Sequence, residues 1–199
     1  MRRIGILLSG RGSNFAAIAR NIAEGKLDAE IAVVISNKPE AAGLETARQL
    51  GLNAVSLPSK GLEREAYDQL VSAELRANQV DLVCLAGYMR LLSAAFVREF
   101  PLRILNIHPS LLPAFSGLDA QHQAFDYGSR VSGCTVHFVD EKLDHGPILL
   151  QEAVPVESGD TAEALSARIL AAEHRLYSQA IGIVLDGRYR IEGRRVILT

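Results

Sequence analysis

Two polar residues near the middle of the sequence have types and spacing suited to acyl-transfer chemistry. Asn106 and His108 lie two residues apart at the end of the predicted strand 103–107. Residues two apart on a β-strand point to the same face, so the amide and the imidazole would meet one ligand. Such a pair suits the oxyanion that forms during acyl transfer. We interpret Asn106 and His108 as a functional pair, although a histidine at a strand end is often only structural.

Asp144 is the carboxylate that we expect to act with this pair. It lies in the acidic segment 140–147, between two predicted strands. Segments of this kind are usually solvated turns. If the loop lies at the same end of the sheet, however, its carboxylate would approach His108 and favour the imidazolium form. The histidine would then suit the role of a general acid near neutral pH.

The turn Ser9-Gly10-Arg11-Gly12-Ser13-Asn14 is a candidate phosphate-binding loop. Its glycines allow close approach of the backbone to a ligand, and the helix predicted after it offers unpaired N–H groups. A tight turn that needs glycine only for its shape is an equally good interpretation. Phe15 replaces the last glycine of a dinucleotide fingerprint, and no acidic residue ends the second strand. A nicotinamide cofactor is therefore disfavoured.

Alternating strands and helices are expected to position these groups. Short apolar runs predict strands at 4–8, 31–36, 53–57, 81–86 and 103–107, and the segments between them predict helices at 14–24, 40–50, 64–77 and 93–100. This order predicts a Rossmann-like α/β fold, with a mostly parallel sheet and helices on both faces. Ligands of such sheets bind beyond the carboxyl ends of the strands.

The second half of the chain has a different pattern. It predicts a strand pair at 131–139 and 148–156, a long helix that Asp160 caps and that ends near Leu185, and a terminal hairpin over 188–198. We expect one domain over residues 1–199, with a phosphate-binding half to about residue 100 and a catalytic half after it.

Composition and charge narrow the function classes. The net charge is −2 and no dense Lys/Arg stripe is present, which argues against nucleic acid binding. No apolar run approaches the ~20 residues of a membrane span, and the first run is too short for a signal peptide. Cys84 and Cys134 lie in strand-like runs and are expected to be buried thiols. The histidines lack metal-ligand spacing, so we expect no metal. A cytoplasmic protein that binds small molecules fits best.

Four segments together resemble the phosphoribosylglycinamide formyltransferases of purine biosynthesis. They are residues 9–14, 85–90 (Leu-Ala-Gly-Tyr-Met-Arg), 106–113 (Asn-Ile-His-Pro-Ser-Leu-Leu-Pro) and 133–139 (Gly-Cys-Thr-Val-His-Phe-Val). The resemblance extends over essentially the whole chain, and the length fits the single-domain bacterial form. It implies that the chain transfers a formyl group from the cosubstrate 10-formyltetrahydrofolate to the amine of N1-(5-phosphoribosyl)glycinamide, as a monomer or homodimer.

The resemblance also implies roles for individual residues. Asn106, His108 and Asp144 match the catalytic residues of the family. The substrate phosphate and ribose would be bound by Gly12, Ser13, Asn14 and Glu173, and the folate by Arg64, Met89, Arg90, Leu91, Leu92, Asn106, Asp140 and Asp144. Two positions depart from the common pattern, because Ser116 stands where proline is frequent and His145 where a small residue is usual.

Two alternatives remain open. One is another formyl-tetrahydrofolate enzyme, either a hydrolase with an additional N-terminal domain or a methionyl-tRNA formyltransferase with an additional C-terminal domain and a basic surface. We expect neither arrangement for this chain. The other is a non-catalytic nucleotide-binding module with Gly10–Asn14 as its phosphate site, which leaves Asn106, His108 and Asp144 without a role.

Overall fold

The computed structural model describes residues 2–199 and divides the chain into two compact units. The first unit extends to Leu105, and the second comprises Asn106–Thr199. The chain passes from one unit to the other within strand β5 (Ile104–His108).

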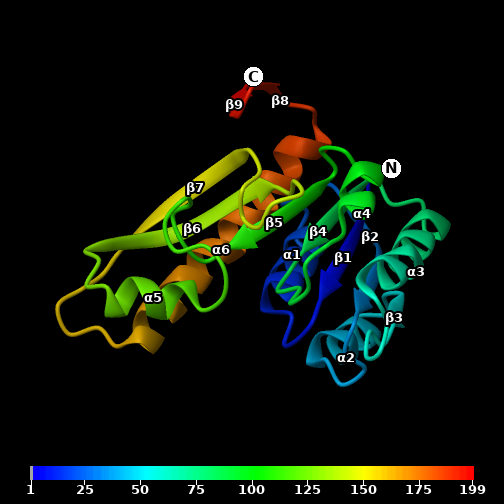
Figure 1. Ribbon diagram of the computed structural model, residues 1–199, viewed down its shortest axis with the longest axis horizontal. Helices are drawn as coiled ribbons and strands as arrows, with labels where there is room; N and C mark the ends of the chain where they lie inside the picture. The colour runs from blue at the N-terminus through cyan, green and yellow to red at the C-terminus, as the bar shows by residue number, and fades with distance from the viewer. Residues whose placement is uncertain (1) are drawn as a thin grey trace. The chain divides into compact units, whose positions relative to one another are not determined.

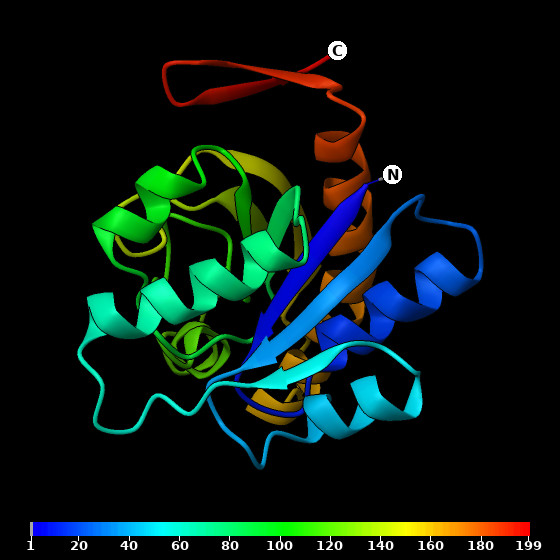
Figure 2. The ribbon, with the colours of Figure 1, turned by 90° about the vertical axis from the view of Figure 1, so that its right-hand side faces the viewer.

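The first unit contains a parallel sheet with helices on both faces. Its strands β1 (Arg3–Leu8), β2 (Glu30–Ser36), β3 (Ala54–Ser56) and β4 (Leu82–Leu85) are arranged in the order β3-β2-β1-β4. Its helices are α1 (Ser13–Ala23), α2 (Ala42–Gln49), α3 (Arg64–Ala77) and α4 (Ala94–Glu99). Figure 2 shows α1 and α2 on one face of this sheet and α3 on the other.

Burial on both faces explains the continuous apolar runs of these strands. Residues 4–8 and 31–36 are fully buried, as expected for central strands of a sheet covered by helices. Capping residues mark the start of α4 and the end of α2. The Ser93 hydroxyl accepts the Phe96 N–H at 3.2 Å and so caps α4, and Gly51 follows α2 with a positive φ of 70°.

The second unit is built on an antiparallel strand pair. Strands β6 (Val131–Phe138) and β7 (Ile148–Pro155) pair along their length, and the long helix α6 (Ala162–Leu185) packs against both. The short helix α5 (Ala120–Asp126) packs on α6. The hairpin of β8 (Tyr189–Glu192) and β9 (Arg195–Leu198) lies beyond the end of α6, as Figure 1 shows. Its strand β9 adds to the edge of β7.

The predicted α/β fold, the strand pair, the long helix and the hairpin are confirmed. The predicted cap of α6 is wrong by one residue, because the Thr161 hydroxyl accepts the Ala164 N–H at 3.2 Å. Asp160 instead accepts two hydrogen bonds of 2.8 Å from Arg168. Cys84 and Cys134 are buried thiols, as predicted. Over residues 2–199, no helix is both long enough and apolar enough to cross a membrane.

Candidate active site

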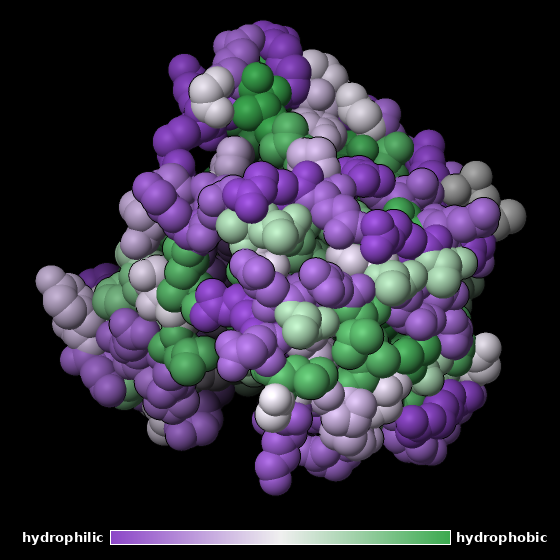
Figure 3. Space-filling view, turned by 45° about the vertical axis from the view of Figure 1, so that its right-hand side comes forward, coloured by the Kyte–Doolittle hydropathy of each residue, from purple (hydrophilic) through white to green (hydrophobic). Residues whose placement is uncertain are grey.

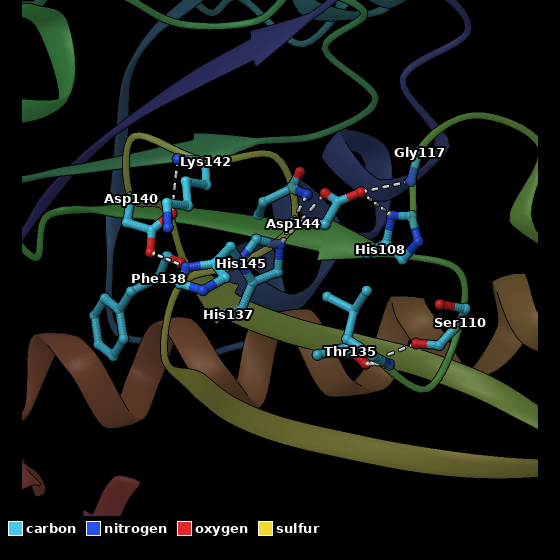
Figure 4. A network of polar contacts seen from close by, with 12 residues as sticks. His108, Ser110, Gly117, Thr135, His137, Phe138, Asp140, Lys142, Asp144 and His145 are labelled. Atoms are coloured by element: carbon cyan, nitrogen blue, oxygen red, sulfur yellow. Dashed lines mark hydrogen bonds and ion pairs between the residues drawn. The ribbon is translucent and has the colours of Figure 1, made fainter. Parts of the chain in front are cut away.

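The second unit brings together the residues that the sequence singled out for acyl-transfer chemistry. Asn106 and His108 lie on β5, and Asp144 lies in the loop 139–147 between β6 and β7. Figure 4 shows the Asp144 carboxylate beside the His108 ring. Asp144 Oδ2 is 3.5 Å from His108 Nδ1, and the two side chains are only 7% and 5% exposed. Charges attract each other more strongly in such a buried place than in water. The predicted approach of the carboxylate to His108 is therefore observed.

The protein holds the His108 ring in one orientation. His108 Nε2 lies 2.8 Å from the backbone oxygen of Phe115. A carbonyl oxygen can only accept, so Nε2 carries a hydrogen and Nδ1 is the nitrogen that faces Asp144. The Nδ1–Oδ2 distance of 3.5 Å is long for a hydrogen bond, so this contact leaves Nδ1 available to a ligand.

His137 on β6 holds Asn106 in an analogous way. Its Nδ1 donates to the Phe138 backbone oxygen at 2.8 Å, and its Nε2 lies 3.2 Å from Asn106 Nδ2. Burial lowers the pKa of His137, which favours the neutral ring. A neutral ring with its hydrogen on Nδ1 accepts a hydrogen bond at Nε2, so the amide nitrogen of Asn106 is directed toward His137. That nitrogen has a second hydrogen, which can serve a ligand.

The segment after β5 is tied to the strand pair by side-chain hydrogen bonds. Thr135 Oγ1 donates to the Ser110 backbone oxygen at 2.6 Å and accepts the Leu112 N–H at 3.1 Å. Gln151 Nε2 donates to the Leu112 backbone oxygen at 2.9 Å. Farther along, the Gly117 N–H donates to Asp144 Oδ2 at 2.8 Å. These bonds fix the backbone that contacts both His108 and Asp144.

The glycine-rich turn of the first unit lies beside the segment after β4. The Ser9 N–H donates to the Gly87 backbone oxygen at 3.0 Å. The Ser9 hydroxyl accepts the Met89 N–H at 2.8 Å and donates to Asn37 Oδ1 at 2.6 Å. Gly12 directly precedes α1 and has a φ of 71°, a left-handed conformation that favours glycine. The turn that leads into α1 is therefore joined at Ser9 to the backbone of Met89.

Ser9→Ala is expected to lower the free energy of unfolding by about 2 kcal/mol, because it leaves a buried amide oxygen and the Met89 N–H without their partner. Differential scanning calorimetry should show a Tm about 5 °C lower. Ser59→Ala is the matched control, since it removes only a 3.4 Å contact to the same Asn37. Equal Tm values for the two variants would contradict the expectation.

Comparison with known proteins decides the family. The model of the family described as formyl transferase matches residues 2–181. The chain belongs to the formyl transferase family. It is 43% identical to the phosphoribosylglycinamide formyltransferase of Escherichia coli (strain K12), over 94% of this chain and 88% of that protein.

Further relatives of this formyl transferase agree. Glycinamide ribonucleotide transformylase 1 from Symbiobacterium toebii superposes with a TM-score of 0.96 and 53% identity, over 100% of this chain and 94% of that one. The chain is 46% identical to the trifunctional purine biosynthetic protein adenosine-3 of Drosophila melanogaster over 94% of its own length. It spans only 14% of that much longer relative.

The residues predicted to bind folate lie mainly in the first unit. Met89 and Leu91 are 63% and 50% exposed. The guanidinium carbon of Arg90 lies 4.5 Å from the centre of the buried Tyr67 ring. Arg64 is exposed at the start of α3, and Leu92 is half-buried. Two exposed apolar side chains next to a cation suit an aromatic, partly anionic ligand. The assignment of these residues to folate stays a prediction.

The remaining predicted site residues lie on α1, on α6 and in the loop between β6 and β7. Gly12, Ser13 and Asn14 lie at the N-terminus of α1. Glu173 is buried on α6. The pKa of the Cys134 thiol is raised to about 12, first by the burial of that thiol and then by the charge of Glu173. Asp140 lies at the start of the loop that carries Asp144. Among residues 2–199, no group of three or more His, Cys, Asp or Glu side chains is arranged to hold a metal ion.

Sequence reasoning assigned no role to three groups that contact the site. His137 is within the motif 133–139, but its position on β6 gave no sign that it meets Asn106. The contacts of Phe115 and Gly117 use backbone atoms, which no side-chain pattern reveals. Only the alternation of β6 could have placed His137 on the face shared with Thr135, two residues earlier.

Proposed function

We propose that the chain transfers the formyl group of 10-formyltetrahydrofolate to the amine of N1-(5-phosphoribosyl)glycinamide, in purine biosynthesis. The relatives in Escherichia coli and Symbiobacterium toebii carry the names of that activity. The observation that supports the proposal most directly is the buried contact of His108 with Asp144, with Asn106 joined to the same cluster through His137. A cytoplasmic location and a monomeric or dimeric state belong to the same proposal.

Asn106 and His108 stabilise the transition state in this proposal. The substrate amine attacks the formyl carbon, and the formyl oxygen becomes an oxyanion. Asn106 donates the second hydrogen of its amide nitrogen, and His108 donates from Nδ1, the ring nitrogen that faces Asp144. One oxyanion donor of this kind is worth about 3 kcal/mol in other enzymes.

Asp144 places a negative charge 3.5 Å from His108 Nδ1, the nitrogen that donates to the oxyanion. When the tetrahedral intermediate collapses, the bond from the formyl carbon to the folate nitrogen breaks. The attacking amine loses one proton and the folate nitrogen gains one, so no net proton is consumed. His108 and Asp144 are placed to carry that proton, directly or through water.

The ligand assignments divide between the two units. In the first unit, Gly12, Ser13 and Asn14 bind the phosphate, supported by the position of these residues at the N-terminus of α1. Folate binds Arg64, Met89, Arg90, Leu91 and Leu92 there, and Asp140 in the second unit. Glu173 binds the ribose hydroxyls.

The decisive experiment incubates the protein with both substrates and separates the products. Formylated ribonucleotide and tetrahydrofolate in equal amounts are expected. Formate release without the ribonucleotide would instead indicate a hydrolase. Binding of the ribonucleotide by calorimetry, without turnover, would indicate a nucleotide-binding module.

Ser13→Ala is expected to raise KM for the ribonucleotide about 10-fold, because it removes one hydrogen bond to a charged phosphate. KM for the folate and kcat should stay close to their wild-type values, which provides the internal control. Ser13 is a better probe than Gly12, because a Cβ at Gly12 would lie 3.1 Å from Gly43 Cα and disturb the fold. Equal changes in both KM values would contradict the assignment of the phosphate site to this turn.

A further inference from the structure

The turn of the C-terminal hairpin contacts the loop that carries Asp144. Arg194 lies between β8 and β9, and its Nη2 donates a short hydrogen bond to the backbone oxygen of His145. Its Nη1 lies 3.3 Å from Nδ1 and 3.1 Å from Nε2 of the same His145. The contacted residue directly follows Asp144 in the chain.

The two distances from Arg194 Nη1 show where this nitrogen lies relative to the His145 ring. The imidazole nitrogens flank one ring carbon, Cε1. An atom in the ring plane at nearly equal distance from both nitrogens would overlap that carbon. Arg194 Nη1 therefore lies over the face of the His145 ring, within hydrogen-bonding distance of both ring nitrogens. Arg194 thus contacts both the ring and the backbone of His145.

Asp140 completes this cluster from the other end of the loop. Its Oδ2 lies 2.7 Å from His145 Nδ1, which donates, and its Oδ1 accepts the Lys142 N–H at 2.9 Å (Figure 4). Partial burial alone would raise the pKa of Asp140, but the hydrogen bonds from His145 and Lys142 and the charge of Arg194 hold it below its usual value. The carboxylate is therefore ionised and compensates the guanidinium charge.

The hairpin offers a fixed point for this contact. Arg195, the next residue, pairs with Ile148 at the edge of β7. The base of the loop is closed by the Phe138 N–H, which donates to the Pro147 backbone oxygen at 2.9 Å. Figure 3 shows the hairpin at the top of the molecule, with hydrophilic and hydrophobic residues side by side on its surface. Arg194 thus joins two segments that are each anchored to the strand pair.

We propose that Arg194 is a positioning residue: it holds His145, and thereby Asp144, in the place from which Asp144 faces His108. The effect on turnover rests on the proposed function, whereas the effect on the loop does not. The plain alternative is a surface contact without consequence, because exposed ion pairs contribute little to stability.

Arg194→Ala tests the proposal against Arg190→Ala as a matched control. Arg190 belongs to the same hairpin, and its guanidinium pairs locally with Glu192 at 2.8 Å. In Arg194→Ala, kcat for formyl transfer is expected to fall about 10-fold, since a displacement of 1 Å in an active site can cost about 100-fold. KM for the ribonucleotide should not change, and Arg190→Ala should behave as wild type.

Two further variants separate positioning from a general loss of structure. Arg194→Lys keeps a donor for the His145 backbone oxygen but loses the second guanidinium nitrogen that contacts the ring, so it should recover part of kcat. His145→Gly removes the ring and leaves the backbone oxygen, and should fall between wild type and Arg194→Ala. If Arg194→Ala does not fold, the comparison of kcat between wild type and Arg194→Lys still tests the proposal, and a lower kcat is expected for Arg194→Lys.

Hydrogen–deuterium exchange of the free protein gives an independent readout. Amides of residues 140–146 should exchange at least several-fold faster in Arg194→Ala than in Arg190→Ala, whereas those of α6 should not change. Equal loop exchange in the two variants would overturn the proposal, whatever the activity. If the wild type transfers no formyl group, the proposed function fails, and loop exchange alone still decides the role of Arg194.

Discussion

Asp144→Asn is expected to lower kcat for formyl transfer about 100-fold while leaving the fold intact. The substitution removes the carboxylate charge that faces His108 Nδ1, the ring nitrogen that donates to the oxyanion in the proposed mechanism. General acid–base groups typically contribute a factor of 100 or more. The Asn amide oxygen can still accept the Gly117 N–H, so the loop should keep its position. Steady-state kinetics and calorimetry measure both effects.

Asp119→Asn provides the matched control for Asp144→Asn. Asp119 also pairs with a histidine, His122, at 2.6 Å, but both side chains are largely exposed to solvent. Asparagine tolerates the positive φ of 58° at this position. This variant should keep full activity. A kcat for Asp144→Asn that equals that of the control would show that the charge beside His108 is not used.

Gly146→Ala should produce the largest combined loss of stability and activity. A Cβ at this position would lie 1.8 Å from the Phe138 backbone oxygen, and a backbone atom cannot rotate away as a side chain can. Overpacking of this kind costs about 3 kcal/mol, which corresponds to a Tm lower by about 10 °C. The loop must also move, and Asp144 lies only two residues before Gly146. A fall in kcat of about 100-fold is expected.

Gly10→Ala is the control for the stability of Gly146→Ala. No atom lies within 4 Å of a Cβ built at Gly10, and its φ is not in the left-handed region. Thermal unfolding followed by circular dichroism should leave Gly10→Ala close to wild type. If Gly146→Ala melts at the wild-type temperature as well, the contact between the loop and Phe138 is not a rigid restraint.

The elements of the fold were predictable because each has a strong local signal. The buried strands of the first unit are continuous apolar runs, and α3 has the predicted bounds, Arg64–Ala77. Helix α5 was not predicted, since only Ala120 and Ala124 of its seven residues are buried and the apolar pattern is too short to detect. The cap of α6 was misplaced because Asp160 and Thr161 are both good capping residues and only one is used.

The candidate site was predictable in part, for a similar reason. The spacing of Asn106 and His108 on one strand is local, so the sequence reveals that they share a face. The approach of Asp144 was a conditional expectation, because it depends on a loop that the sequence does not place. The contact between His145 and Arg194 joins residues 49 positions apart, and the sequence of neither segment indicates the other.

The hydrogen bond from His108 to the Phe115 backbone has an evolutionary consequence. Because the acceptor is a main-chain oxygen, any residue at position 115 can supply it, provided that the chain adopts the observed φ of 52°. Glycine, asparagine and aspartate adopt that conformation most readily. Selection for this contact should therefore act on backbone shape at position 115, whereas the side chain answers only to its ring contact with Tyr127. The contact could persist through substitutions that erase every trace of it from a comparison of side chains.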